Sequence, residues 1–140
     1  MEEDKKRFAQ ATDAREVNFV LAEQDVTVFK EQVKNSDVVY VRGGSSEMAI
    51  EAFKPLTFDF TTLMDGKIYA GSSAGVMFLS HNTRSHTGDW KKGLGILPFN
   101  SVVHWSEDLR ESLESFQETK LDNDYEMLLI PETEFIVKEI

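Results

Sequence analysis

The segment Gly71-Ser72-Ser73-Ala74-Gly75 carries the strongest chemical signal in the chain. It matches the Gly-x-Ser-x-Gly pattern, in which a serine between a strand and a helix sits in a strained turn with its hydroxyl exposed. Small neighbours let the two backbones approach, and the helix N-terminus favours developing negative charge. We therefore predict Ser73 as a nucleophile and the backbone N–H of Ala74 as an oxyanion donor. The alternative interpretation is a Gly/Ser-rich turn that precedes a helix without catalytic function.

A second glycine-rich turn, Gly43-Gly44-Ser45-Ser46, also lies between an apolar run and a segment with helical spacing. In an open parallel sheet, ligands bind beyond the carboxyl ends of the strands, so both turns should face one crevice. The backbone N–H of Gly44 is then a candidate second oxyanion donor. The alternative is a plain connecting turn that uses glycine for its backbone freedom.

A serine nucleophile needs a base, and the chain has three histidines. His104 ends a predicted strand, which places it at the same carboxyl edge as Ser73, so it is the preferred base. His81 and His86 lie in a polar stretch and are expected to be exposed loop residues. Their spacing is not that of metal ligands and the chain has no cysteine, so we predict neither a metal nor a cofactor.

The acid that would orient the base is not determined by spacing. Asp89 lies in the loop between serine and histidine and is our choice. Glu107 and Asp108 follow His104, where their charges complement a helix dipole. Glu132, which follows a late strand, is a further option.

The elements that must position these groups alternate between strand and helix along the chain. Apolar β-rich runs predict strands, and helical spacing with capping residues predicts helices between them. The expected strands cover 16–22, 37–41, 67–70, 102–103, 127–130 and 134–137. Helices are expected over 4–12, 58–64 and 76–80, after a cap at Asp25 up to Asn35, after a cap at Ser45 or Ser46 up to Pro55, and after a cap at Ser106 through Phe116. The stretch 81–95 is expected to be irregular. This alternation predicts an α/β three-layer sandwich with a mostly parallel sheet and helices on both faces.

The composition narrows the class of protein. A length of 140 residues argues for a single domain over 1–140. With 15 Lys+Arg against 25 Asp+Glu the net charge is −10, which disfavours a nucleic-acid partner. No apolar run is long enough to span a membrane, and the charged N-terminus MEEDKKRFAQ is not a secretory signal. We therefore expect a soluble cytoplasmic protein.

Three blocks, VVYVRGGSS, YAGSSAGVMFLS and GLGILPFNSVVHW, occur in an order that resembles the dipeptidase E and cyanophycinase family of serine peptidases. The resemblance implies a fold related to the class I glutamine amidotransferases. It also implies hydrolysis of short aspartate-containing peptides, with Ser73 as nucleophile, His104 as base, and Gly44 and Ala74 as oxyanion donors. An acidic substrate would need a cation in the crevice, for which the candidates are Arg42, Arg84 and Lys91.

Two departures from the family pattern bear on these expectations. The family aspartate in the loop before the histidine aligns near Asn82, so Asp89 is assigned by its availability. The first strands of the family are expected to be missing, which would leave a sheet edge for the helix over 4–12 or a second copy of the chain to cover. The rival functions are a catalytically silent binding module and a small-ester hydrolase that uses the same turn.

Overall fold

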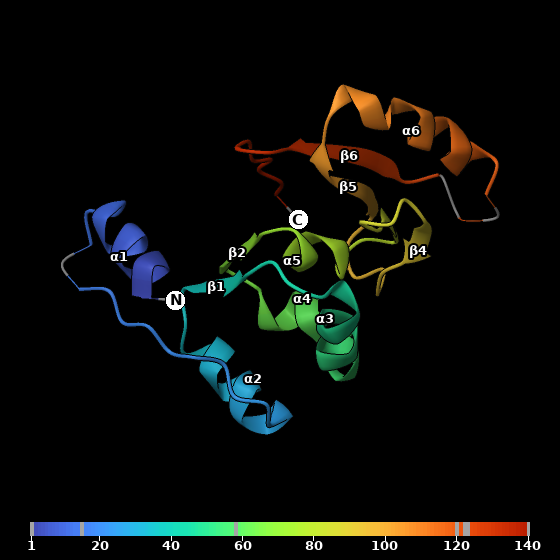
Figure 1. The fold of residues 1–140 in the computed structure, drawn as a ribbon. Helices are drawn as coiled ribbons and strands as arrows, with labels where there is room; N and C mark the ends of the chain where they lie inside the picture. The colour runs from blue at the N-terminus through green and yellow to red at the C-terminus, as the bar shows by residue number, and fades with distance from the viewer. Residues whose placement is uncertain (1, 15, 58, 120, 122–123, 140) are drawn as a thin grey trace.

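The computed structural model describes residues 2–14, 16–57, 59–119, 121 and 124–139. Short helices and strands follow one another along the described chain (Figure 1). In chain order they are α1 (Glu2–Gln10), α2 (Val26–Lys34), β1 (Val38–Val41), α3 (Ser46–Phe53), η1 (Lys54–Leu56), α4 (Phe60–Leu63), β2 (Ile68–Gly71), α5 (Ala74–Met77), β3 (Asn82–Arg84), β4 (Trp90–Lys92), β5 (Phe99–Trp105), η2 (Glu107–Leu109), α6 (Arg110–Gln117) and β6 (Glu126–Pro131). None of the described helices is long and apolar enough to cross a membrane.

The described strands pair into two sheets instead of the single sheet predicted. β1 and β2 form a parallel pair, and the other sheet has the order β4-β3-β5-β6. Its strands β3, β5 and β6 run parallel, whereas β4 is antiparallel to β3. The short helix α5 contacts both β2 and β5, and it lies between the two sheets in Figure 1. The mixed α/β class and the mostly parallel pairing are therefore confirmed.

Aromatic rings form the core beneath β1 and β2. Phe78, fully buried just after α5, stacks on Phe53 of α3 at a centroid distance of 4.3 Å. Phe60 of α4 meets the edges of both Phe78 and Tyr69, at 6.2 and 5.7 Å. Edge-to-face and offset contacts of this kind add to the energy of apolar burial. The cluster therefore ties α3, α4 and β2 to the segment that follows α5.

The opposite face of β1 and β2 is largely uncovered. Val38, Tyr40 and Ile68 on this face have exposed fractions of 44%, 41% and 63%. The helix α1 reaches the strand through Phe8, whose ring lies 5.1 Å from that of Tyr40. Parallel strands are normally covered on both faces. The three-layer arrangement predicted for the sheet is therefore wrong at this face, which α1 covers only in part.

Two predicted strands are absent and one hairpin was missed. Residues 16–22 and 134–137 form no strand in the described chain. The apolar run within 16–22 has no neighbouring strand to pair with, and Val20 and Leu21 are about 70% exposed. Conversely, β3 and β4 pair within the stretch expected to be irregular. Their polar residues hid the strand pattern, because buried hydroxyls and amides occupy positions that apolar side chains usually fill.

Those buried polar side chains bond one another across the second sheet. Ser80, after α5, bonds the hydroxyl of Ser101 in β5 at 2.7 Å, and Ser101 donates to Thr83 Oγ1 in β3 at 3.1 Å. Beside them, Asn82 Nδ2 donates to Asn100 Oδ1 at 2.8 Å. Buried polar groups are tolerated when they are hydrogen-bonded, and these bonds attach the end of the α5 segment to β5.

Candidate active site

Ser73 occupies a strained turn between β2 and α5. Its backbone angles are φ 51° and ψ −110°, a conformation that residues other than glycine rarely adopt. The two glycines around it allow very close backbone contacts. A Cβ atom on Gly71 would lie 2.7 Å from the carbonyl oxygen of Gly75, and one on Gly75 would lie 2.3 Å from that of Val41. The Gly-x-Ser-x-Gly pattern is thus required by sterics at this crossing of strand and helix.

His104 reaches Ser73 from the other sheet. The pairing of β5 with β6 shifts register between Val103 and Trp105, so that His104 lies at a bulge, with φ 56°. Bulges redirect side chains at the ends of strands. Here the imidazole Nε2 lies 2.9 Å from Ser73 Oγ. The structure therefore brings together the two residues that the sequence proposed as nucleophile and base.

Glu132, directly after β6, holds the other side of the imidazole. Its Oε1 lies 2.5 Å from His104 Nδ1. In the neutral tautomer that this geometry favours, Nδ1–H donates to Glu132, and Nε2 accepts the hydroxyl proton of Ser73. The next residue, Thr133, also has a positive φ of 65°. Ser73, His104 and Glu132 thus form a serine–histidine–carboxylate chain drawn from the ends of β2, β5 and β6.

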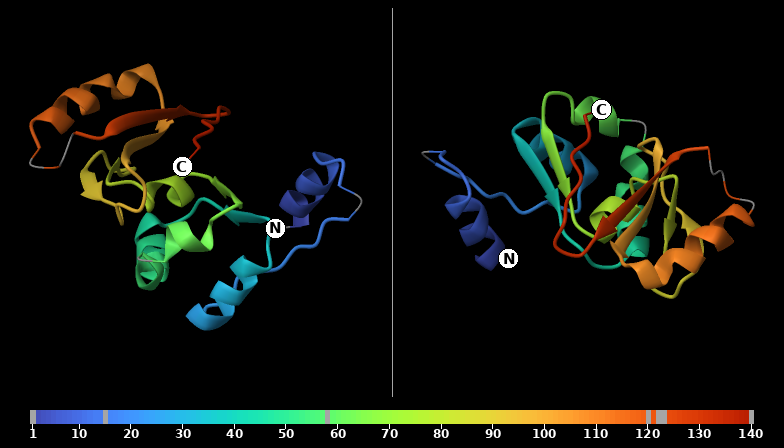
Figure 2. Two further views of the ribbon diagram at one scale, coloured as in Figure 1. Left: turned by 180° about the vertical axis from the view of Figure 1, so that it is seen from behind. Right: turned by 90° about the horizontal axis from the view of Figure 1, so that it is seen from above.

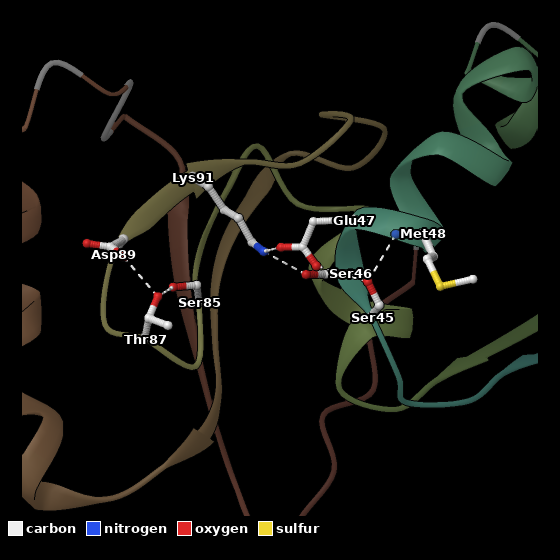
Figure 3. A network of polar contacts seen from close by, with 8 residues as sticks. All are labelled: Ser45, Ser46, Glu47, Met48, Ser85, Thr87, Asp89 and Lys91. Carbon is white, nitrogen blue, oxygen red and sulfur yellow. Dashed lines mark hydrogen bonds and ion pairs between the residues drawn. The ribbon is translucent and has the colours of Figure 1, made fainter.

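Asp89, the acid preferred from sequence, is not placed at His104. It lies in the turn between β3 and β4, where its carboxylate accepts the hydroxyl of Thr87 at 2.8 Å and Thr87 bonds Ser85 (Figure 3). The turn hydroxyls therefore satisfy Asp89, and the carboxylate that the structure places at His104 is that of Glu132. Of the further carboxylates considered, Glu107 accepts bonds from Arg110 instead. The pairing of β5 with β6 brings Glu132 to the histidine, and no spacing within the chain reveals that.

The glycine turn after β1 lies against the nucleophile. A Cβ atom on Gly43 would lie 3.2 Å from Ser73 Cβ and 3.8 Å from its Oγ, whereas one on Gly44 would meet nothing within 4 Å. Gly44 therefore borders open space beside the serine. Among the residues described, neither Gly44 nor Ala74 uses its amide in a hydrogen bond. The oxyanion role predicted for these two amides therefore stays a prediction.

Two of the three candidate cations flank this turn. Arg42 directly follows β1 and precedes the turn; its side chain is 60% exposed and lies 3.4 Å from Asp4 Oδ2. Lys91 of β4 extends to the start of α3 just after the turn, where Nζ donates to Ser46 Oγ at 2.7 Å and pairs with Glu47 (Figure 3). The hydrogen bond from Lys91 lowers the pKa of Glu47 to about 2. Glu47 is therefore charged at neutral pH, and the charge of Lys91 is already neutralised by this ion pair.

Arg84, the third candidate, points elsewhere. Its Nε donates to Ser112 Oγ of α6 at 2.9 Å, and its guanidinium also bonds the Ser85 carbonyl. His86 is exposed, as expected, whereas His81 stacks on Tyr125 with ring centroids 3.7 Å apart. The described residues contain no group of three His, Cys, Asp or Glu side chains that could hold a metal ion.

Comparison with known proteins identifies the family. No curated protein matches the chain. A family model described as Peptidase family S51 matches residues 1–139, nearly the whole sequence. The chain therefore belongs to Peptidase family S51, the family of dipeptidase E and cyanophycinase, which confirms the resemblance. This family implies a class I glutamine amidotransferase-like fold, consistent with the mostly parallel sheets.

Proposed function

We propose that this member of Peptidase family S51 is a serine peptidase that cleaves short aspartate-containing peptides. The observation that carries the proposal is the hydrogen-bonded chain from Ser73 Oγ through the imidazole of His104 to Glu132. A hydroxyl activated by a base that is itself oriented by a carboxylate is the arrangement used for acyl transfer. The aspartate preference comes from family membership and needs a cation near Ser73, for which Arg42, 60% exposed and next to the Gly43–Gly44 turn, is the candidate.

In the acylation step, Ser73 Oγ attacks the scissile carbonyl carbon as its proton moves to His104 Nε2. The carbonyl π electrons move to oxygen, and the amides of Gly44 and Ala74 stabilise the oxyanion that forms. As the tetrahedral intermediate collapses, the C–N bond breaks and the imidazolium gives its proton to the leaving amine. Ser73 is then an ester of the substrate's acyl group.

In the deacylation step, water attacks the ester carbon while His104 accepts a proton from it. The bond to Ser73 Oγ then breaks, the serine recovers its proton from the imidazolium, and the carboxylic acid product leaves. Glu132 accepts the Nδ1–H bond throughout and stabilises the cationic imidazole in both steps. His104 and Glu132 have side chains 54% and 74% exposed, so bulk water has direct access to them.

A fluorophosphonate probe tests the reactivity of the serine. We expect stoichiometric labelling at Ser73 and no labelling of Ser73→Ala. The matched control is Ser72→Ala, because Ser72 is the neighbouring hydroxyl and lies outside the hydrogen-bonded chain. A folded protein that resists the probe would refute the hydrolase proposal and favour the silent binding module.

A substrate panel tests the peptidase assignment. Aspartyl dipeptides, the matching asparaginyl dipeptides and simple acyl esters should be compared on the same preparation. The asparaginyl peptides differ only by the missing negative charge, so preferential turnover of the aspartyl set would support cation-assisted recognition. Turnover of esters alone would refute the peptidase assignment.

A further inference from the structure

We propose that Tyr69 is a positioning residue that holds the strained serine turn through its phenolic hydroxyl. The hydroxyl donates to the carbonyl oxygen of Gly75 at 2.5 Å. Gly75 lies two residues beyond Ser73, and Tyr69 lies four residues before it on β2. The inference rests on the proposed function, because it assigns Tyr69 a role in presenting Ser73 as a nucleophile.

The carbonyl that Tyr69 binds lacks the usual helical partner. The helix α5 has only four residues, and the amide of Leu79, which would bond Gly75 in a longer helix, donates to Val76 at 3.1 Å. Among the described residues, the hydroxyl of Tyr69 is the donor that satisfies this oxygen. A carbonyl left unpaired inside a protein is costly, so the tyrosine supplies a required bond.

The bond acts on the strained part of the turn. A non-glycine residue at φ 51° persists only when the surrounding structure enforces that conformation. Gly75 is pressed against the carbonyl of Val41 on one side and held by the tyrosine on the other. Releasing one side lets the turn relax, which moves Ser73 Oγ relative to His104 Nε2 and changes the direction of the Ala74 amide.

The ring of Tyr69 is fixed independently of its hydroxyl. It packs against Phe60 and Phe78 at centroid distances of 5.7 and 6.3 Å, and a Cβ on Gly71 would lie 2.8 Å from its Cε1. Burial also raises the pKa of Tyr69 well above its ordinary value, so the phenol keeps its proton at working pH. Tyr69→Phe therefore removes one hydrogen bond and leaves the packing in place.

The test compares Tyr69→Phe with the unmodified protein. We expect kcat and the rate of fluorophosphonate labelling to fall by about ten- to hundredfold, the effect of a small misplacement of reacting groups. KM should change by less than about twofold, because the substrate contacts are untouched. The shape of the pH–rate profile should stay the same, since His104 and Glu132 keep their bond.

Two control variants separate positioning from stability. Tyr40→Phe removes a hydroxyl from β1 that has no hydrogen bond in the described structure, and it should label at the normal rate. Val33→Ala truncates a buried residue of α2, far along the chain from the serine turn. It should lower the melting temperature without slowing the labelling of folded protein. Equal slowing in Val33→Ala and Tyr69→Phe would mean that lost stability, and not positioning, is the cause.

The outcomes distinguish this inference from the proposed function. An unlabelled wild-type protein would refute the proposed function itself. A labelled wild type with equally fast labelling of Tyr69→Phe would overturn only the role of Tyr69. If Tyr69→Phe does not fold, proton NMR of the wild type decides, because a slowly exchanging Tyr69 hydroxyl proton supports the bond and a rapidly exchanging one overturns it.

Discussion

Replacing Glu132 with glutamine isolates the contribution of the carboxylate to the serine–histidine pair. The substitution keeps the length and shape of the side chain that lies 2.5 Å from His104 Nδ1, but it removes the negative charge that would face the imidazolium. We expect Glu132→Gln to slow turnover and fluorophosphonate labelling while leaving the fold intact, because the side chain is 74% exposed.

The exposure of Glu132 also sets the size of the expected loss. Removing the acid of a serine–histidine–acid triad costs about 10⁴-fold in kcat where that acid is buried. Glu132 is largely in water, which screens its charge and can partly replace it as a hydrogen-bond acceptor. We therefore expect a loss of about 10²- to 10³-fold, and less dependence on Glu132 at high salt.

The assay is the second-order rate constant of labelling, measured beside the melting temperature of each variant. Asp89→Asn is the matched control, because Asp89 is also an exposed carboxylate but bonds Thr87 instead of the histidine. It should label within about twofold of wild type, as surface changes away from a site usually do. The assignment of the acid would be refuted if Glu132→Gln were labelled at the wild-type rate while Asp89→Asn lost its labelling.

Three further substitutions test the surroundings of the site. Gly75→Ala would place a Cβ 2.3 Å from a backbone oxygen of β1, and we expect it to lower the unfolding free energy by about 3 kcal/mol in urea titrations; an unchanged midpoint would contradict the close contact. The pKa of Glu47 falls from 4.5 to about 2 in the folded state, so its pairing with Lys91 stabilises the fold above pH 4.5 and is lost as the pH falls towards 2. The melting temperature of wild type should therefore drop more steeply over that range than that of Glu47→Gln, and parallel curves would show that the pair contributes nothing. Thr133→Gly relieves a positive φ and should raise the unfolding free energy by about 1 kcal/mol, whereas a lower melting temperature would show that Thr133 is not strained.

The candidate site residues that the sequence indicates, and that the structure brings together, are those with local signals. The strand, the small residues and the helix around Ser73 are contiguous, and His104 ends an apolar run. Glu132 could not be selected from sequence because it reaches His104 through the pairing of β5 with β6 and the bulge between them. The position of Asp89 between the serine and the histidine in the chain favoured it from sequence. In the structure it lies in the turn between β3 and β4, where its carboxylate accepts a hydrogen bond from Thr87.

In the fold, too, features that depend on neighbouring residues were predictable, whereas features that depend on distant pairing were not. Several helices and strands were predicted because apolar spacing and capping residues are local signals, as in the capping of α2 by Asp25. The strand predicted over 16–22 had the right composition but no neighbour to pair with. The β3–β4 hairpin has a neighbour but a polar pattern, since Thr83 and Asn82 are buried and bonded to β5. Pairing partners are properties of the whole chain, and one sequence does not reveal them.

Because the strands form two sheets, the distance between Ser73 and His104 depends on how the two sheets are placed relative to each other. Ser73 belongs to the β1–β2 sheet, whereas His104 and Glu132 belong to the other, and no described strand pair joins the two (Figure 2). The α5 segment joins them, with its buried Ser80–Ser101 bond. A small hinge motion at this joint would break the serine–histidine bond while both sheets stay folded. Catalytic competence should therefore be lost at a lower temperature than secondary structure, and it should respond to crowding or binding that presses the two sheets together.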